Sequence, residues 1–182
     1  MNVADIGGEP TWQDLIDSAV ALRGDLLGRG WMLGCAESCT GGLVAAAITS
    51  IAGSSEWFER GFVTYSNRAK TELLGVPEAL LAAHGAVSRD VALAMAQGVL
   101  AHAPVQAALA VTGIAGPGGG SLDKPVGLVW FGWAWRQGQA VRSEAQSVVW
   151  PGDRQAVRMA SAHHALDGLR LRLAPPAGSS GG

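Results

Sequence analysis

Several features that assign proteins to particular classes are scarce in this sequence or missing from it. Only 15% of its 182 residues are charged, and 13 basic residues nearly balance 15 acidic ones, for a formal net charge of -2. Lys and Arg form no cluster of the kind that binds nucleic acid or acidic membranes. No apolar run is long enough to span a bilayer. We therefore expect neither a nucleic-acid partner nor a membrane-bound protein.

Cysteine is equally scarce, and the placement of the two cysteines argues against a disulfide framework and against a metal site. Cys35 and Cys39 are the only two, and they lie too close together to clip a long loop with a disulfide. Their spacing is not the usual spacing of metal ligands, and no second pair of Cys or His residues is at hand to complete a metal site. The first ten residues, MNVADIGGEP, contain no apolar segment resembling a signal peptide. These absences predict a cytoplasmic protein with no metal and no other cofactor.

Apolar residues, in contrast, are plentiful. They make up 48% of the chain, which is enough for one globular domain with a substantial core. We expect residues 1–10 to form a flexible N-terminus and residues 11–173 to form the domain. Residues 174–182, rich in Pro, Gly and Ser, are expected to be a disordered tail.

Apolar periodicity and capping residues predict alternating helices and strands. Such interleaving predicts an α/β fold, a three-layer α/β/α sandwich with a mixed sheet in a single domain. The nearly all-apolar stretch QAALAVT is expected to be a central strand covered on both faces. Helices are predicted to begin at Thr11 and Ser88 and to cover 41–51, 67–75 and 152–173, with a helical turn at 55–61; strands are predicted at 31–37, 62–66, 106–112, 126–135 and 140–149.

The stretch AESCTGG joins a predicted strand to a predicted helix and carries hydroxyl and thiol groups followed by two glycines. Ser38 would lie at the carboxyl edge of the sheet, where open α/β folds bind ligands. The helix that follows would offer free N–H groups at Thr40, Gly41 and Gly42, suited to an anion or an oxyanion. The plainer interpretation makes Ser38 or Thr40 a helix cap and the glycines a means of close packing.

A serine becomes a strong nucleophile only when a base takes its proton. The chain has four histidines, and none of them falls in a loop predicted at the sheet edge, although a Ser-His-Asp arrangement stays possible. Lys70 and Lys124 are the only lysines. Lys70 is expected one turn into a helix, close to Tyr65, the only tyrosine, at the end of a predicted strand. A solvated lysine and a core tyrosine are the alternative interpretation.

A glycine-rich stretch, TGIAGPGGG, follows the predicted central strand directly. Its N–H groups could form an anion-binding nest, or the stretch could simply be a long turn. It lacks the Gly-Lys-Ser/Thr ending of a P-loop. Arg154, in the block GDR, is a candidate partner for a phosphate or a carboxylate, or a surface ion pair.

Taken together, these blocks resemble one known family. AESCTGG, TYSNRAKTELLGV, AVTGIAGPGGG, KPVGLVW and GDRQAVR occur in the order and spacing of the CinA C-terminal domain family, the nicotinamide-nucleotide amidases of the PncC type. The resemblance covers about Thr11 to Leu173. It implies a three-layer sandwich and deamidation of nicotinamide mononucleotide to nicotinate mononucleotide and ammonia, a step in pyridine-nucleotide recycling.

The resemblance also implies roles for individual residues. Ser38 matches the nucleophile, Lys70 the base, and Tyr65 a group that assists proton transfer; Cys39 is a rival nucleophile by proximity alone. Substrate contacts are implied for Thr112, Gly113, Gly116 and Arg154.

Two alternatives come from other classes: a non-catalytic nucleotide-binding module, and an accessory role linked to competence or DNA damage. A homo-oligomer is also expected, because the aromatic hairpin carrying Trp130, Phe131, Trp133 and Trp135 could supply an interface, although ordinary sheet packing explains it equally well.

Overall fold

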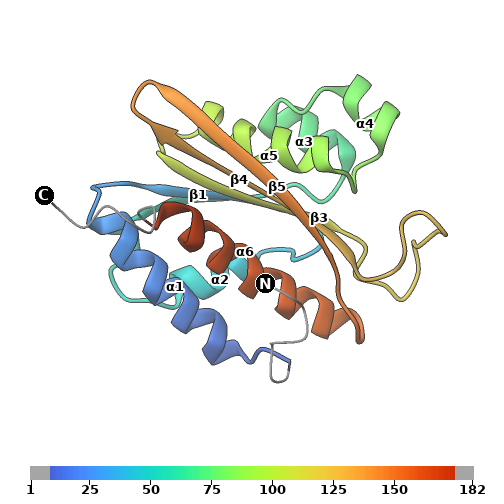
Figure 1. Ribbon diagram of the computed structural model, residues 1–182, viewed down its shortest axis with the longest axis horizontal. Helices are drawn as coiled ribbons and strands as arrows, with labels where there is room; N and C mark the ends of the chain where they lie inside the picture. Colours follow the sequence, from blue (N-terminus) through green and yellow to red (C-terminus); the bar gives the residue numbers. More distant parts are fainter. Residues whose placement is uncertain (1–8, 175–182) are drawn as a thin grey trace, which may run out of the picture.

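Five strands form one mixed sheet in the order β2-β1-β3-β4-β5 (Figure 1). The computed structural model describes residues 9–174 of the chain, so the expectations for residues 1–8 and 175–182 lie outside the described residues. β1 pairs in parallel with both β2 and β3, whereas β3, β4 and β5 pair antiparallel. The strands are β1 (Leu33–Glu37), β2 (Phe58–Val63), β3 (Ala107–Gly113), β4 (Leu128–Gln137) and β5 (Ala140–Val149).

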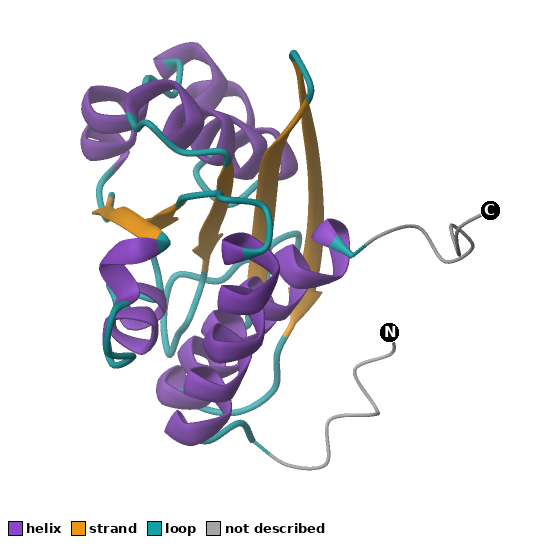
Figure 2. Cartoon of the chain, turned by 90° about the vertical axis from the view of Figure 1, so that its left-hand side faces the viewer, coloured by secondary structure: helices purple, strands orange, loops and turns teal. Residues whose placement is uncertain are grey.

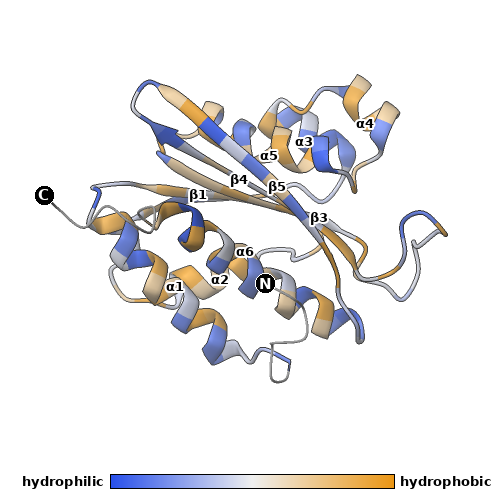
Figure 3. Cartoon of the chain, viewed as in Figure 1, coloured by the Kyte–Doolittle hydropathy of each residue, from blue (hydrophilic) through white to orange (hydrophobic). Residues whose placement is uncertain are grey.

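Helices cover both faces of this sheet, which confirms the predicted three-layer sandwich (Figures 1 and 2). One layer contains α1, α2 and α6, and the other contains α3, α4 and α5. The longer helices α1, α5 and α6 carry both apolar and hydrophilic residues, as expected for helices that bury one face, whereas the short α2 is almost entirely apolar (Figure 3). The helices are α1 (Trp12–Leu27), α2 (Leu43–Thr49), α3 (Asn67–Leu74), α4 (Glu78–His84), α5 (Arg89–His102) and α6 (Arg154–Leu173).

The core consists of two clusters, one on each side of the sheet. β3 contributes to both, and its residues 107–111 are fully buried, which confirms the central strand predicted from its unbroken apolar sequence. Gly132 in β4 lets α5 lie directly on the sheet, since a Cβ there would come within 2.1 Å of the Ala92 carbonyl oxygen. None of the helices within residues 9–174 combines the length and apolar character that a membrane span requires.

The helix starts follow local hydrogen-bonding signals. Thr11 and Asp14 form the predicted capping box at the start of α1. Ser88 caps α5 as predicted, and Asp153 caps α6, each by accepting a backbone N–H bond on its side chain. The α4 helix was not expected from the sequence, although Pro77 before it and Gly85 after it are recognised helix boundaries.

One strand boundary was wrongly predicted. β2 begins at Phe58 and ends at Val63, whereas the sequence suggested a helical turn over 55–61 and a strand over 62–66. A short 3-10 helix at Ser54–Glu56 ends early enough for Phe58 to pair with Leu33. Because β2 stops level with β1, Tyr65 lies in the loop after the strand and not at its end.

The aromatic hairpin contributes mainly to the core. Phe131 and Trp133 are fully buried and stack with ring centroids 5.8 Å apart. The indole N–H of Trp133 donates to the Ala165 carbonyl of α6 at 2.9 Å. Ordinary sheet packing therefore explains these two side chains, and the homo-oligomer stays a prediction.

Candidate active site

A cavity of about 280 Å³ opens where β1 and β3 end. The carboxyl edge of a parallel sheet is where open α/β folds bind ligands. The cavity brings together seven of the ten predicted site residues from four separate parts of the chain, and Thr40, Gly41 and Gly42 are not part of its lining. Those seven are Ser38, Tyr65, Lys70, Thr112, Gly113, Gly116 and Arg154.

Ser38 and Lys70 are in direct contact. Ser38 follows the last residue of β1, and its backbone N–H donates to the Val111 carbonyl at 2.9 Å, which extends the pairing with β3 by one residue. Lys70 lies in the first turn of α3, where Ser66 caps the helix through the Ala69 N–H. The Lys70 Nζ atom is 3.1 Å from the Ser38 Oγ atom. The pairing anticipated from sequence is therefore present in the geometry.

Lys70 is almost completely buried, with 1% of its surface exposed. Its Nζ also donates to the backbone carbonyls of Thr64 at 2.8 Å and Tyr65 at 3.4 Å. It forms no ion pair with any carboxylate in residues 9–174. Burial therefore lowers the pKa of Lys70 from 10.5 to about 8. At that pKa a substantial fraction of the amine is neutral near pH 8 and able to accept a proton.

Cys39 lies beside Ser38 but in a less reactive state. Its side chain lines the same cavity and is 6% exposed. Burial raises the pKa of the Cys39 thiol to about 11. Because the thiolate is the reactive form of cysteine, this environment disfavours Cys39 as a nucleophile.

The other candidate bases lie elsewhere. None of the four histidines, all within the described part of the chain, hydrogen-bonds to Ser38. His164 packs in the core, 4.6 Å from the ring centroid of Phe131, and burial lowers the pKa of its imidazole to about 4. Lys124 donates to the His84 carbonyl at 2.6 Å. The geometry thus favours Lys70 over a Ser-His-Asp arrangement and over Lys124.

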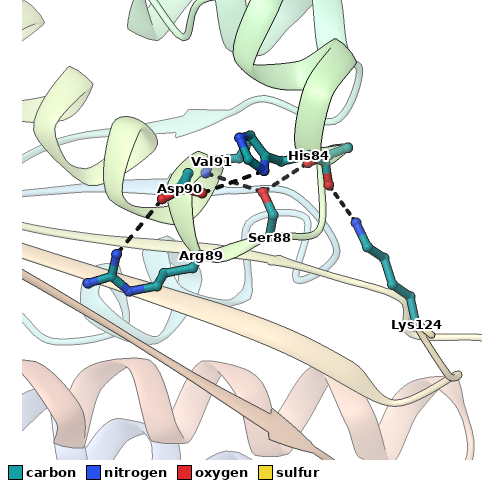
Figure 4. Close-up of polar contacts among 7 residues, drawn as sticks. His84, Ser88, Arg89, Asp90, Val91 and Lys124 are labelled. Carbon is teal, nitrogen blue, oxygen red and sulfur yellow. Dashed lines mark hydrogen bonds and ion pairs between the residues drawn. The ribbon is translucent and has the colours of Figure 1, made fainter.

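Lys124 instead connects the glycine-rich loop to the α4–α5 turn, as Figure 4 shows. In that view Ser88 and Asp90 begin α5 beside the His84 ring, and the Asp90 carboxylate lies 3.7 Å from His84 Nδ1. On the inner side of the same turn, the Thr112 hydroxyl donates to the Ala86 carbonyl at 2.9 Å. The predicted substrate residue Thr112 therefore already has a structural partner, and the turn forms one wall of the cavity.

The backbone of the glycine-rich loop is largely unpaired. The N–H groups of Ala115, Gly116, Gly118 and Gly119 donate to no other residue within 9–174. Gly113 is required for packing, since a Cβ there would come within 2.6 Å of the Val129 side chain. The loop therefore offers unpaired donors beside the cavity, as an anion-binding nest would.

Tyr65 and Arg154 form a second polar pair in the cavity wall. An Arg154 Nη atom donates to the Tyr65 hydroxyl at 3.0 Å, and the other Nη donates to the Gly116 carbonyl at 2.9 Å. Tyr65 is 61% exposed, so it is not the core tyrosine of the alternative interpretation. Its hydroxyl contacts Arg154 and not Ser38.

The expectation that the Gly41 and Gly42 amides are free is wrong. The Gly41 N–H donates to the Ser38 carbonyl at 3.1 Å, and the Gly42 N–H donates to the Glu37 carboxylate at 2.9 Å. Both glycines have positive φ angles, 60° and 102°, which explains why glycine occupies both positions. The amides of Cys39 and Thr40, in contrast, donate to no oxygen atom in the described residues, so the expectation of a free amide holds for Thr40.

Glu37 is the residue that the sequence analysis missed. Its carboxylate is buried, with the residue 1% exposed, and it accepts N–H bonds from Gly42, Val44 and Ala45 at the start of α2. Neither Ser38 nor Thr40 caps this helix, so the plainer interpretation of their hydroxyls is also wrong. A glutamate at the end of a buried strand, just before a glycine pair, was the available signal.

Replacing Glu37 with glutamine is expected to lower the free energy of unfolding by about 2–4 kcal/mol. The glutamine NH₂ group would face backbone N–H donors and leave at least one of them unpaired. Urea unfolding monitored by circular dichroism measures the change. Glu72→Gln, in an exposed pair with Arg68, is the matched control and should change stability by less than about 0.5 kcal/mol. Equal effects of the two variants would contradict the capping role.

No group of three or more His, Cys, Asp or Glu side chains within residues 9–174 is arranged to hold a metal ion. The polar groups at the cavity are hydroxyls, one thiol, one amine, one guanidinium and backbone amides. This set suits proton transfer and anion binding.

The sequence matches the model of the CinA C-terminal domain over residues 17–173. The chain belongs to this family. Nicotinamide-nucleotide amidohydrolase PncC of Enterobacter agglomerans is 54% identical over 152 residues, which cover 84% of this chain and 91% of that protein. The protein of the same name in Escherichia coli K12 is 54% identical over 145 residues, covering 79% of this chain and 86% of that protein.

Solved structures support the fold as well as the family. The competence/damage inducible protein CihA of Agrobacterium tumefaciens superposes with a TM-score of 0.82 at 45% identity, covering 92% of this chain and 99% of that one. The competence damage-inducible protein A of Klebsiella pneumoniae also has a TM-score of 0.82, at 37% identity, covering 87% of this chain and 96% of that one.

Proposed function

We propose that this chain is a nicotinamide-nucleotide amidohydrolase that converts nicotinamide mononucleotide to nicotinate mononucleotide and ammonia. Ser38 is the nucleophile and Lys70 the base. The observation that carries the proposal is the 3.1 Å contact between Lys70 Nζ and Ser38 Oγ at the floor of a cavity. Relatives named as nicotinamide-nucleotide amidohydrolases support the substrate class.

The first chemical step is acyl transfer to the serine. Neutral Lys70 takes the Ser38 hydroxyl proton as Oγ attacks the carboxamide carbon, and a C–O bond forms while the carbonyl π electrons move onto oxygen. The Cys39 amide, free of other oxygen acceptors and beside the nucleophile, is the donor that we assign to this oxyanion. When the C–N bond breaks, the Lys70 ammonium returns its proton to the leaving group, which departs as ammonia.

The second step releases the product and restores the enzyme. Lys70 accepts a proton from water, which attacks the nicotinoyl ester, and then donates that proton to Ser38 Oγ as the C–O bond breaks. We assign these transfers to Lys70 because its Nζ lies within hydrogen-bond distance of Ser38 Oγ, whereas the Tyr65 hydroxyl contacts Arg154. Tyr65 then assists at the cavity wall by holding Arg154.

The nucleotide phosphate requires a cationic or N–H-rich partner. Arg154 lines the cavity, and the unpaired amides of Gly116, Gly118 and Gly119 lie on the same loop that its guanidinium contacts. We infer that the guanidinium and the amides bind the phosphate together.

The experiment is ammonia release measured with nicotinamide mononucleotide and with nicotinamide riboside, which lacks the phosphate. Wild-type protein should turn over the mononucleotide. Arg154→Ala should raise KM for the mononucleotide about tenfold or more, with little change in kcat/KM for the riboside. If wild-type protein binds the mononucleotide but releases no ammonia, the chain is a nucleotide-binding module and the proposal is wrong.

A further inference from the structure

A second cavity, of about 650 Å³, lies at the opposite end of the sheet from Ser38. It is formed where α1 and α6 end, β1 begins and the β4–β5 hairpin turns. In Figure 1 these segments lie together at the left of the view, and the loop after β3 lies at the right. Trp31 at one end of β1 is seven residues from Ser38 at the other, about 20 Å along an extended strand. This cavity is therefore separate from the candidate active site.

Its charge differs in sign from that of the whole chain. The lining includes four arginines, Arg29, Arg136, Arg142 and Arg172, and a single acidic residue, Glu144. The chain as a whole has a formal net charge of -2. A concave, electropositive site on a slightly acidic protein favours an anionic ligand.

One of these arginines is already occupied. Arg172 donates to the Glu144 carboxylate at 2.9 Å, and its guanidinium carbon lies 3.6 Å from the ring centroid of Trp133. It also donates to the Gly168 carbonyl of α6. Arg172 therefore serves as a fixed part of the cavity wall, and its charge is offset by Glu144.

The other three arginines, Arg29, Arg136 and Arg142, have no carboxylate partner within residues 9–174. Arg142 uses its Nε to donate to Gln137 Oε1 at 2.8 Å, which leaves both Nη atoms without a partner in the described chain. Arg29 donates only to backbone carbonyls, those of Asp25 and Leu173. No carboxylate in the described chain thus offsets these positive charges beside the cavity. Guanidinium groups of this kind bind phosphates through paired N–H donors.

Two partly buried tryptophans, Trp31 and Trp135, supply flat apolar surface in the same lining. The guanidinium of Arg29 lies 5.8 Å from the Trp31 ring centroid, and Arg142 is the cross-strand neighbour of Trp135. Each tryptophan therefore has an arginine beside it. This arrangement matches a ligand that joins an aromatic ring to an anionic group.

We propose that this arginine–tryptophan cavity binds a nucleoside phosphate. Its base packs against Trp31 and Trp135, and its phosphate contacts Arg142 and Arg29. The volume lies within the range of small-molecule sites, and the cavity is bounded by helix ends on one side and the hairpin on the other. The proposal does not depend on the chemistry at Ser38.

The test is titration of the full-length protein with ADP, followed by tryptophan fluorescence and confirmed by calorimetry. Saturable binding is expected, weakened at least tenfold in Arg142→Ala and weakened similarly when adenosine or inorganic phosphate replaces ADP. Arg142 is exposed on an edge strand, so this variant should keep its fold. Arg68→Ala, at an arginine 85% exposed on α3, is the matched control and should bind as wild type does.

Four results would overturn the proposal. One is the absence of saturable binding at millimolar ADP, and another is equal affinity of wild type and Arg142→Ala. Loss of binding in Arg154→Ala with retention in Arg142→Ala would assign the nucleotide to the Ser38 cavity. A single-stranded oligonucleotide that binds far more tightly than ADP, with a steep salt dependence, would likewise replace the small ligand with nucleic acid.

Discussion

Ser38→Ala is expected to lower kcat for ammonia release from nicotinamide mononucleotide by roughly a thousandfold or more, because removal of a catalytic nucleophile typically costs at least that much. The substitution deletes one hydroxyl at a position that is 9% exposed and hydrogen-bonded through its backbone to β3. The fold should therefore survive. Nucleotide binding should also be retained, since the proposed role of Ser38 is attack on the carboxamide carbon, whereas the phosphate is assigned to Arg154 and the glycine-rich loop. Activity and calorimetric binding of the same preparation measure both effects.

The control for Ser38→Ala is a substitution at the neighbouring residue. Cys39→Ala removes the rival nucleophile next to Ser38, a thiol with a pKa of about 11. It should keep activity within about tenfold of wild type, since burial keeps this thiol protonated. Hydroxylamine added to the wild-type reaction should also trap the nicotinoyl ester as a hydroxamate. Activity that survives in Ser38→Ala but disappears in Cys39→Ala would assign the attack to the thiol.

The activity of the wild-type protein should depend on pH through Lys70. With a Lys70 pKa of about 8, log(kcat/KM) is expected to rise with a slope near one below pH 8 and to level off above it. Lys70→Arg should lose roughly a thousandfold in kcat, because a guanidinium keeps its proton throughout this range. A flat profile between pH 6 and 9 with the chemical step rate-limiting would exclude Lys70 as the base.

The same pKa predicts a stability effect with a definite sign. The folded state lowers the Lys70 pKa from 10.5 to about 8, so the unfolded chain binds more protons between those two values. Wild-type stability relative to Lys70→Met should therefore rise as pH increases from about 8 toward 10.5, by about 3 kcal/mol in total. Urea unfolding of both proteins across this range measures the difference in their unfolding free energies. The other titrating groups contribute equally to both proteins and cancel from this difference. If the two proteins gave parallel curves of stability against pH, burial would be shown to destabilise the Lys70 ammonium only slightly.

The sequence predicted those parts of the fold whose signals are local. An unbroken apolar run identified β3, and side-chain caps identified the starts of α1 and α5. The limits of β2 depend instead on its register with β1, a contact between segments far apart in sequence. Such a boundary has no local signal, so Tyr65 was placed at the end of a strand that stops two residues earlier.

In the candidate site, too, the residues in recognisable sequence blocks were predicted, and the residue whose partners come from a separate helix was missed. Ser38 and Lys70 belong to recognisable blocks, and the parallel crossover brings them to one edge of the sheet. Glu37 was missed because a buried carboxylate in a strand is unusual, and its three N–H partners become visible only when the first turn of α2 is placed beside it. Gly41 and Gly42 were singled out for a ligand or for close packing, whereas the structure explains them by their positive φ angles.

The sheet order has a consequence for how this family can diverge. The side chains that we propose as nucleophile and base both come from one continuous β1-α2-β2-α3 unit, whereas the glycine-rich loop and Arg154, which we propose as the phosphate site, come from later segments. On this proposal, chemistry and recognition are encoded in separate stretches of the gene. Exchanging residues 113–127 between relatives should shift the preferred nucleotide while the acylation machinery is inherited intact, so new specificities can evolve by loop replacement alone.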